Sequence, residues 1–304
     1  MIGLLFAAAL VDTSIAVQQN PDLILIHEWG VVTLAGEMAA GAIPRTGYLE
    51  PWEDPSSMED KAPVVLFYGA DFSGADFTVE LHGGSFTDAF PLPTGASLED
   101  AAITWSIDSA RNLGESYVIP PASLPTGGDD CGWAFESWRD GPAHVLEFPD
   151  GARDRFIYYE CSVPFNPGQP PYPFDPARGV DADYDGPVLV FDRDEGETVR
   201  MAVCSAGLAA DATLDWVPCE RQTVMEVLCG MAGGDMKSGE IADLWDTWEG
   251  YVTGGGWTGD RLMVFRLPAD LVDRLSSVSL ETSEGYETQT VRYFLGMAPF
   301  SYTF

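Results

Sequence analysis

The chain has 304 residues, of which 46% are hydrophobic and 12% aromatic, so it is too apolar to be disordered and long enough for one large core or two packed units. It carries 48 acidic and 15 basic residues, a formal net charge of −33. Such a surface repels the phosphates of nucleic acids and of anionic lipids, which excludes both as expected partners. The charge favours cations or basic partners, and a solvated surface suited to saline surroundings is the alternative.

The N-terminal segment has the pattern of a signal peptide. An apolar run covers residues 2–11, and Ser14 and Ala16 then stand at positions −3 and −1 of a signal-peptidase site. The run is too short for a membrane-spanning helix, and no later run has the length that such a helix needs. We therefore expect a signal peptide over residues 1–16 and export to the periplasm, cell envelope or medium. No Lys or Arg precedes the run, so a buried N-terminal strand is the alternative.

Short runs of β-branched and aromatic residues, divided by Gly, Asp and Pro, predict strands in the first two thirds of the chain. The first run, residues 23–34, is almost entirely apolar, which predicts a strand buried on both faces. Further strands are expected at residues 63–68, 77–82, 102–107, 143–148, 154–159, 187–191 and 198–203. We expect loops at residues 43–61 and, because it carries six prolines, at residues 164–176. The pattern predicts an antiparallel β-sandwich-like region over residues 17–205.

The hydrophobic period changes from two residues to 3.6 after Cys219. Helices are predicted at residues 220–229 and 241–252, a short helix at Pro268, and strands at residues 261–267, 278–282 and 288–295. Residues 206–304 are therefore expected to form a helix-on-sheet, α+β C-terminal region. The predicted fold class is mainly β with a smaller α+β part.

Five cysteines in an exported chain favour disulfides. Cys219 and Cys229 flank a predicted helix, about 15 Å apart, which exceeds the limit of about 7 Å between the Cα atoms of a disulfide. We therefore expect pairs between Cys131 and Cys161 and between Cys204 and Cys219, with Cys229 buried and free. A four-cysteine zinc site is the alternative, although the chain has no pair of cysteines two residues apart.

The sharpest local motif is an acidic loop. Asp181, Asp183 and Asp185 stand at positions 1, 3 and 5 of the calcium-loop template, Gly186 at position 6 and Asp192 at position 12. Carboxylates this close together repel one another unless a cation lies between them. The four aspartates are therefore the candidate metal ligands, with calcium as the candidate cofactor. An acidic hairpin turn is the alternative, because no helix flanks the loop and Asp-Gly is a common turn pair.

His27 and Glu28 are polar residues within an otherwise apolar predicted strand. Burying them is costly unless each finds a partner. Because successive side chains of a strand face opposite ways, the two are not expected to share one site unless a bulge intervenes. The simpler interpretation pairs Glu28 with an arginine and gives His27 a hydrogen bond within the core. A role in general acid–base chemistry is the alternative and makes them the catalytic candidates. The spacing of His27, His82 and His144 indicates no metal site.

At His27, Glu28, Trp29 and Gly30 the chain resembles a group of secreted bacterial proteins of unknown function that carry a His-Glu-Trp-Gly-Thr segment, with Val31 here in the fifth position. Residues 62–68, 155–159 and 248–265 extend the resemblance. It implies export and one shared architecture, and it carries over no catalytic residue.

These features predict an exported, acidic, disulfide-containing binding or envelope protein whose ligand is an extracellular molecule or surface that the sequence does not identify. The alternative is a secreted hydrolase that acts on carbohydrate or ester through acidic residues. Motifs for nucleotide binding, zinc proteases and serine hydrolases are absent from the sequence.

Overall fold

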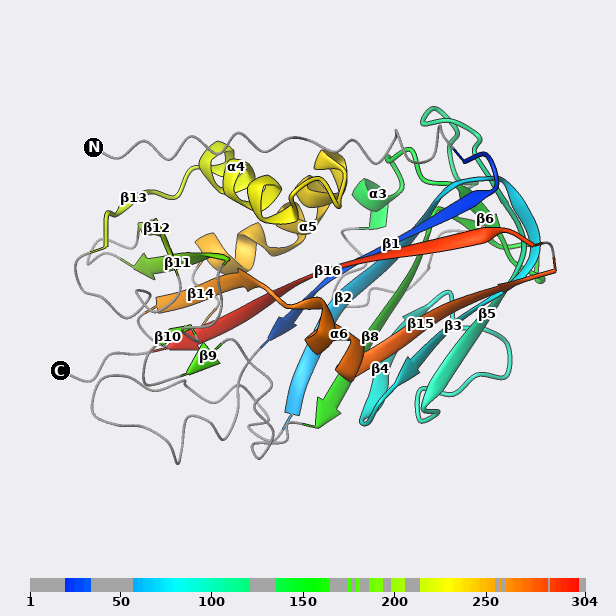
Figure 1. Ribbon diagram of the computed structural model, residues 1–304, viewed down its shortest axis with the longest axis horizontal. Helices are drawn as coiled ribbons and strands as arrows, with labels where there is room; N and C mark the ends of the chain where they lie inside the picture. The colour runs from blue at the N-terminus through cyan, green and yellow to red at the C-terminus, as the bar shows by residue number, and fades with distance from the viewer. Residues whose placement is uncertain are drawn as a thin grey trace.

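The computed structural model describes residues 20–33, 57–120, 135–164, 174–175, 179–180, 186–193, 198–205, 214–254, 257, 261–283 and 285–300. This part of the chain is mainly β, with two large sheets and few helices, which confirms the predicted fold class (Figure 1). None of the helices in these ranges is long and apolar enough to cross a membrane.

The larger sheet has nine strands in the order β13-β12-β11-β14-β16-β1-β2-β8-β4. Only β1 and β16 run parallel, and the other neighbours are antiparallel. The bounds are β1 (Leu23–Thr33), β2 (Ser57–Gly69), β4 (Ser85–Phe90), β8 (Phe156–Pro164), β11 (Pro187–Arg193), β12 (Val199–Ser205), β13 (Val217–Pro218), β14 (Arg261–Arg266) and β16 (Glu287–Phe300).

The smaller sheet has five strands in the order β15-β3-β5-β6-β7. Its members are β3 (Phe72–Leu81), β5 (Ala102–Arg111), β6 (Val145–Glu147), β7 (Arg153–Asp154) and β15 (Ser276–Thr282). A separate pair is formed by β9 (Phe174–Asp175) and β10 (Gly179–Val180). The helices are α3 (Phe135–Trp138), α4 (Arg221–Ala232), α5 (Ser238–Thr253) and α6 (Ala269–Leu275).

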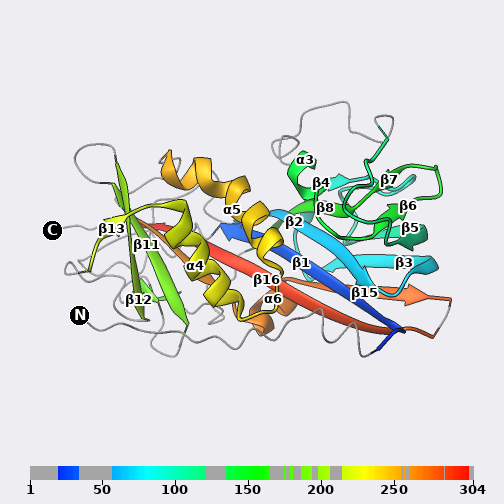
Figure 2. The ribbon, with the colours of Figure 1, turned by 90° about the horizontal axis from the view of Figure 1, so that it is seen from above.

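Two cores lie on opposite faces of the nine-stranded sheet. Ile24 and Ile26 of β1 point into the core shared with the five-stranded sheet, whereas Leu25 and Trp29 point into the core beneath α4 and α5. Figure 2 shows these helices lying across the larger sheet. All residues of β1 are buried, which confirms the predicted strand covered on both faces.

Strands from both sides of residue 205 share both sheets. In the nine-stranded sheet, β16 lies between β14 and β1, and in the five-stranded sheet β15 pairs with β3. The division into regions 17–205 and 206–304 stays a prediction, but the N-terminal strands and the C-terminal strands build one pair of sheets.

Some elements differ from the expectations. The expected loop at residues 43–61 overlaps β2, which begins at Ser57, because polar residues 57–61 pair through their main chain with β1 and β8. The short strand β4 is not predicted by the sequence, because its apolar residues Phe86, Ala89 and Phe90 do not alternate with polar ones. Pro268 is the N-cap of α6 and Ala269 its first residue.

The predicted disulfide between Cys204 and Cys219 is wrong, because both are free thiols. Arg200 in β12 pairs with Pro218, so Cys219 lies opposite the start of β12, about 16 Å along the strand from Cys204. Burial raises the pKa of each of these two thiols to about 11. Cys229 is free as expected, but it is only partly buried. Cys131 lies outside the described residues, so its pairing with Cys161 stays a prediction.

Candidate functional site

His27 and Glu28 lie on opposite faces of β1 and belong to two separate buried clusters. His27 points toward α5, where its partner is Glu240, whereas Glu28 points between the sheets toward Tyr159 and Arg292. The register irregularity in β1 lies between Trp29 and Val31 and does not bring the two side chains together. They cannot act as one acid–base pair.

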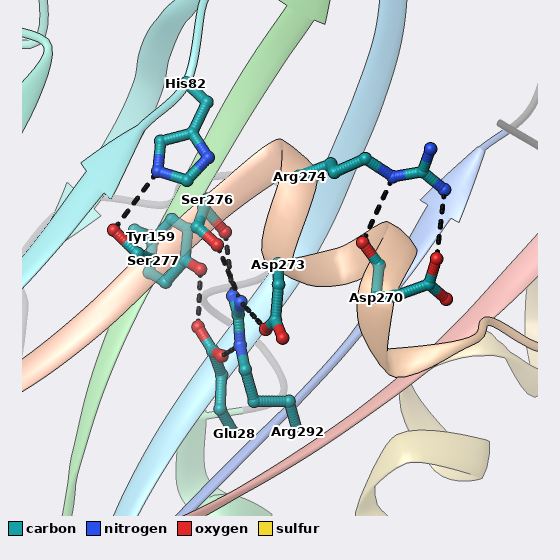
Figure 3. A network of polar contacts seen from close by, with 9 residues as sticks. All are labelled: Glu28, His82, Tyr159, Asp270, Asp273, Arg274, Ser276, Ser277 and Arg292. Atoms are coloured by element: carbon teal, nitrogen blue, oxygen red, sulfur yellow. Dashed lines mark hydrogen bonds and ion pairs between the residues drawn. The ribbon is translucent and has the colours of Figure 1, made fainter. Parts of the chain in front are cut away.

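The Glu28 cluster comprises Glu28, Tyr159, Arg292, Ser276 and Asp273 (Figure 3). The Tyr159 hydroxyl donates a 2.6 Å hydrogen bond to Glu28, and the Arg292 Nε group donates to the other carboxylate oxygen. The remaining Arg292 nitrogens donate to the Ser276 carbonyl and hydroxyl, both at 2.7 Å, and to Asp273 at 3.2 Å. One guanidinium thereby ties β1 and β16 to the junction of α6 and β15.

Burial by itself would lower the pKa of Arg292, but the adjacent Glu28 carboxylate raises it above its ordinary value. Glu28 is 0% exposed, and both of its oxygens accept hydrogen bonds. Charges buried in this way are stable only while both partners are present. The cluster therefore holds the two sheets together, and both oxygens of its carboxylate already accept hydrogen bonds.

The His27 cluster lies beneath the first turn of α5 and comprises His27, Glu240, Tyr68 and Lys237. His27 Nδ1 lies 2.9 Å from both oxygens of Glu240, and the Tyr68 hydroxyl donates to the same carboxylate at 2.8 Å. The Lys237 main-chain N–H donates to Glu240 at 2.7 Å, and the Lys237 ammonium lies 3.3 Å from the centre of the Tyr68 ring. Glu240 therefore caps α5 and orients the imidazole at the same time.

The electrostatics of this cluster keep Tyr68 as a hydrogen-bond donor. Burial, followed by the negative charge of Glu240, raises the pKa of the Tyr68 hydroxyl well above its ordinary value. The second nitrogen of His27, Nε2, is buried without a hydrogen-bond partner. An imidazole oriented by a carboxylate is the arrangement of general bases and of metal-ligating histidines, although the His27 side chain is 0% exposed.

The three histidines do not converge. His144 Nδ1 lies 2.9 Å from the Phe67 carbonyl oxygen, and burial lowers the pKa of this imidazole. His82 directly follows β3 and is exposed, and its Nε2 atom lies 3.3 Å from the Ser277 hydroxyl oxygen. Within the described ranges, no three His, Cys, Asp or Glu side chains lie close enough to hold a metal ion.

Of the four aspartates in the predicted calcium loop, Asp181, Asp183 and Asp185 lie outside the described residues. Asp192 is described and nearly buried in β11. Its carboxylate lies 2.9 Å from Arg200 and 3.6 Å from Arg261, so two guanidinium groups already neutralise it. The calcium site stays a prediction, and its one described aspartate, Asp192, is already paired with two arginines.

An accessible recess of about 500 Å³ lies beyond the end of β14 and includes the outer side of the Glu28 cluster. Its polar lining comprises Asp235, Arg266, Asp273, Ser277, Thr290 and Arg292. Arg266 donates to Asp235 at 2.7 Å and to the Met231 carbonyl at the end of α4 at 3.1 Å. The sequence carries no motif for this recess, because its residues come from the loop after α4 and from β14, α6, β15 and β16.

No protein-family model, curated protein or solved structure matches the chain. The similarity at residues 27–30 stays an expectation.

Proposed function

We propose that the protein is an exported, acidic, non-enzymatic binding protein that holds its ligand at the recess between β14, α6, β15 and β16. The observation that carries this proposal is the contrast between the two kinds of site. His27 and Glu28 are fully buried and engaged on opposite faces of β1, whereas the carboxylates of the recess, Asp235 and Asp273, are exposed.

The charge of the recess favours a cationic ligand. The Asp273 side chain is 66% exposed while that of its partner Arg292 is 8% exposed, and Asp235 is 49% exposed against 30% for Arg266. The carboxylates are therefore the outermost charges, and the arginines lie behind them. In a chain of net charge −33, these carboxylates attract basic groups.

Binding of a lysine oligomer tests the ligand class. Fluorescence anisotropy with labelled tetralysine should show binding that weakens several-fold in Asp235→Asn with Asp273→Asn, because two surface carboxylates are lost. The matched control is Asp108→Asn, which removes an exposed carboxylate from β5 and should leave the affinity unchanged. Equal affinity of all three proteins would show that the whole surface, and not the recess, attracts the probe.

Export is tested by the N-terminus of the mature protein. When the full chain is expressed in a bacterium, we expect the exported product to begin at Val17, after cleavage behind Ala16. A product that keeps residues 1–16 would contradict the signal peptide.

Calcium stabilisation is part of the same proposal. A thermal melt in EDTA should shift upward when calcium is added, by an amount equivalent to about 2.7 kcal/mol at a hundred times the dissociation constant. The variant Asp183→Ala with Asp185→Ala should lose the shift, and magnesium serves as the control ion. A shift that persists in the variant would assign the effect to screening of the surface charge.

A hydrolase is the second candidate, and one observation favours it: the Glu240-oriented imidazole of His27 has a free Nε2. In that case chromogenic esters or glycosides would be turned over, and Glu240→Gln would reduce turnover by roughly 10²-fold or more. If the protein is a binding protein, no turnover that depends on Glu240 should be measured.

A further inference from the structure

The strand β16 has an open edge along its first half. On one side β1 pairs with residues 287–297 of β16. On the other side β14 pairs only with residues 295–300, from Arg266 opposite Leu295 to Arg261 opposite Phe300. Within the described part of the chain, residues 287–293 of β16 therefore have a strand neighbour on one side only.

The hydrogen bonds show which main-chain groups face this edge. The Glu287 N–H donates to the Asp22 carbonyl next to β1 at 3.1 Å, and the Phe294 carbonyl accepts from the Leu267 N–H on the opposite side at 2.8 Å. Since successive residues of a strand direct their main-chain groups to alternate sides, Thr288, Thr290 and Arg292 direct both N–H and C=O to the open edge.

The strand β15 presents a second edge beside the same recess. It is the outermost strand of the five-stranded sheet, with β3 as its neighbour. The Leu275 carbonyl accepts from the His82 N–H at 2.9 Å, so by alternation Val278 and Leu280 direct their main-chain groups away from β3. β15 and β16 diverge from their connection (Figure 1), and residues of both line the recess.

Resting on the proposed binding function, we propose that the recess receives an extended segment of a basic partner protein, which adds as a strand to β16 at Thr288, Thr290 and Arg292. Unpaired main-chain donors and acceptors at a sheet edge form a template for another strand. Thr288 and Thr290 are exposed β-branched residues, which favour the extended conformation. Backbone pairing supplies the register, and the carboxylates of Asp235 and Asp273 select lysine or arginine side chains.

A second copy of this chain is a poorer occupant of the same edge. Pairing β16 with itself would bring together two molecules that each carry a net charge of −33, with an exposed Glu287 on each edge. The repulsion between such surfaces opposes self-association. A basic segment would instead be attracted electrostatically to the same edge.

The test uses a labelled peptide of alternating lysine and valine as the probe, with fluorescence anisotropy as the measurement. Thr290→Pro removes one outward N–H, a change that an edge strand tolerates, and should weaken binding roughly tenfold through the lost main-chain hydrogen bonds. Thr290→Ala keeps the N–H and should bind as the wild type does. A peptide methylated on alternate main-chain nitrogens should bind no better to the wild type than to Thr290→Pro.

Hydrogen exchange of the wild type gives a second measurement that needs no variant. Added peptide should slow amide exchange at Thr288, Thr290 and Arg292. The amides of Glu287 and Gln289 face the β1 side, so their exchange should change little. Unchanged exchange at Thr290 with saturating peptide would overturn strand addition even if Thr290→Pro fails to fold.

The outcomes separate this inference from the binding function on which it rests. If Thr290→Pro and wild type bind the peptide equally while Asp235→Asn with Asp273→Asn weakens it, the recess is a cation site and strand addition is wrong. If no peptide binds at millimolar concentration, the inference is overturned, and tetralysine binding reports on the proposed function independently. If the wild type forms a concentration-dependent dimer and Thr290→Pro abolishes it, the occupant of the edge is a second copy of the chain and not a basic partner.

Discussion

Gly30 lies where the neighbouring strands β2 and β16 approach β1 closely. A Cβ atom at this position would lie 3.0 Å from the Phe294 ring and 3.1 Å from the Pro63 Cα atom. Because main-chain atoms cannot move aside as easily as a side chain, Gly30→Ala should lower the free energy of unfolding by about 1–3 kcal/mol. Urea denaturation measures the change. Gly141→Ala, which meets nothing within 4 Å, is the matched control, and equal losses in both variants would contradict the close approach.

The ion pair between Glu28 and Arg292 is also a feature of single residues. Glu28→Gln leaves Arg292 buried without its closest counter-charge, so the free energy of unfolding should fall by about 3–5 kcal/mol. In the double variant Glu28→Gln with Arg292→Met, the loss should be smaller than the sum of the two single losses, because no uncompensated charge remains. Denaturation of the four proteins completes the cycle, and strict additivity would show that the two groups do not interact.

At the scale of one element, α5 carries a carboxyl group that opposes folding at neutral pH. Burial, and then the charges of Asp246, Glu240 and Asp140, raises the pKa of Asp243 to about 7. A carboxyl with a raised folded-state pKa holds its proton more tightly in the folded state. Stability is therefore lost as pH rises from about 4 to 7.

Asp243→Asn should remove this loss. The melting temperature of this variant should exceed that of the wild type at pH 8. The difference should be equivalent to a few kcal/mol at most, because one pKa unit corresponds to about 1.4 kcal/mol. Near pH 4 the two proteins should melt alike. Thermal melts across this range give the result, with Asp108→Asn on β5 as the exposed control. A difference between wild type and Asp243→Asn that is constant with pH would contradict the raised pKa.

Local patterns predicted the long, strongly periodic elements well. The helices expected at residues 220–229 and 241–252 are α4 and α5, and the strand expected at residues 23–34 is β1. The first residues of β2 were missed because they are mostly polar and enter the sheet through main-chain pairing with β1 and β8. The strand β4 was missed because its apolar residues do not follow an alternating pattern. The alternation of side chains along β1 correctly predicted that His27 and Glu28 face opposite sides of the sheet.

At the scale of the whole molecule, the net charge of −33 should make stability depend on salt. Like charges repel more strongly in the compact state than in the unfolded chain, and at 0.1 M salt the screening length is about 10 Å. The melting temperature should therefore rise from low to moderate sodium chloride. Choline chloride should act alike, because the effect is screening and not ion binding. A melting temperature that falls with both salts would show that attractive ion pairs dominate.

The sequence by itself determined the fold class, the two-sided burial of β1, the opposite directions of His27 and Glu28, and the acidic character of the surface. These depend on composition and on periodicity over a few residues. Only the tertiary structure decided the partners: Glu28 meets Arg292 from 264 positions away, and His27 meets Glu240 from 213 positions away. It also separated Cys204 from Cys219 and, within the described residues, left the first half of β16 with a strand neighbour on the β1 side only. Such contacts depend on which strands become adjacent, and one of thirteen arginines cannot be chosen for Glu28 from spacing along the chain.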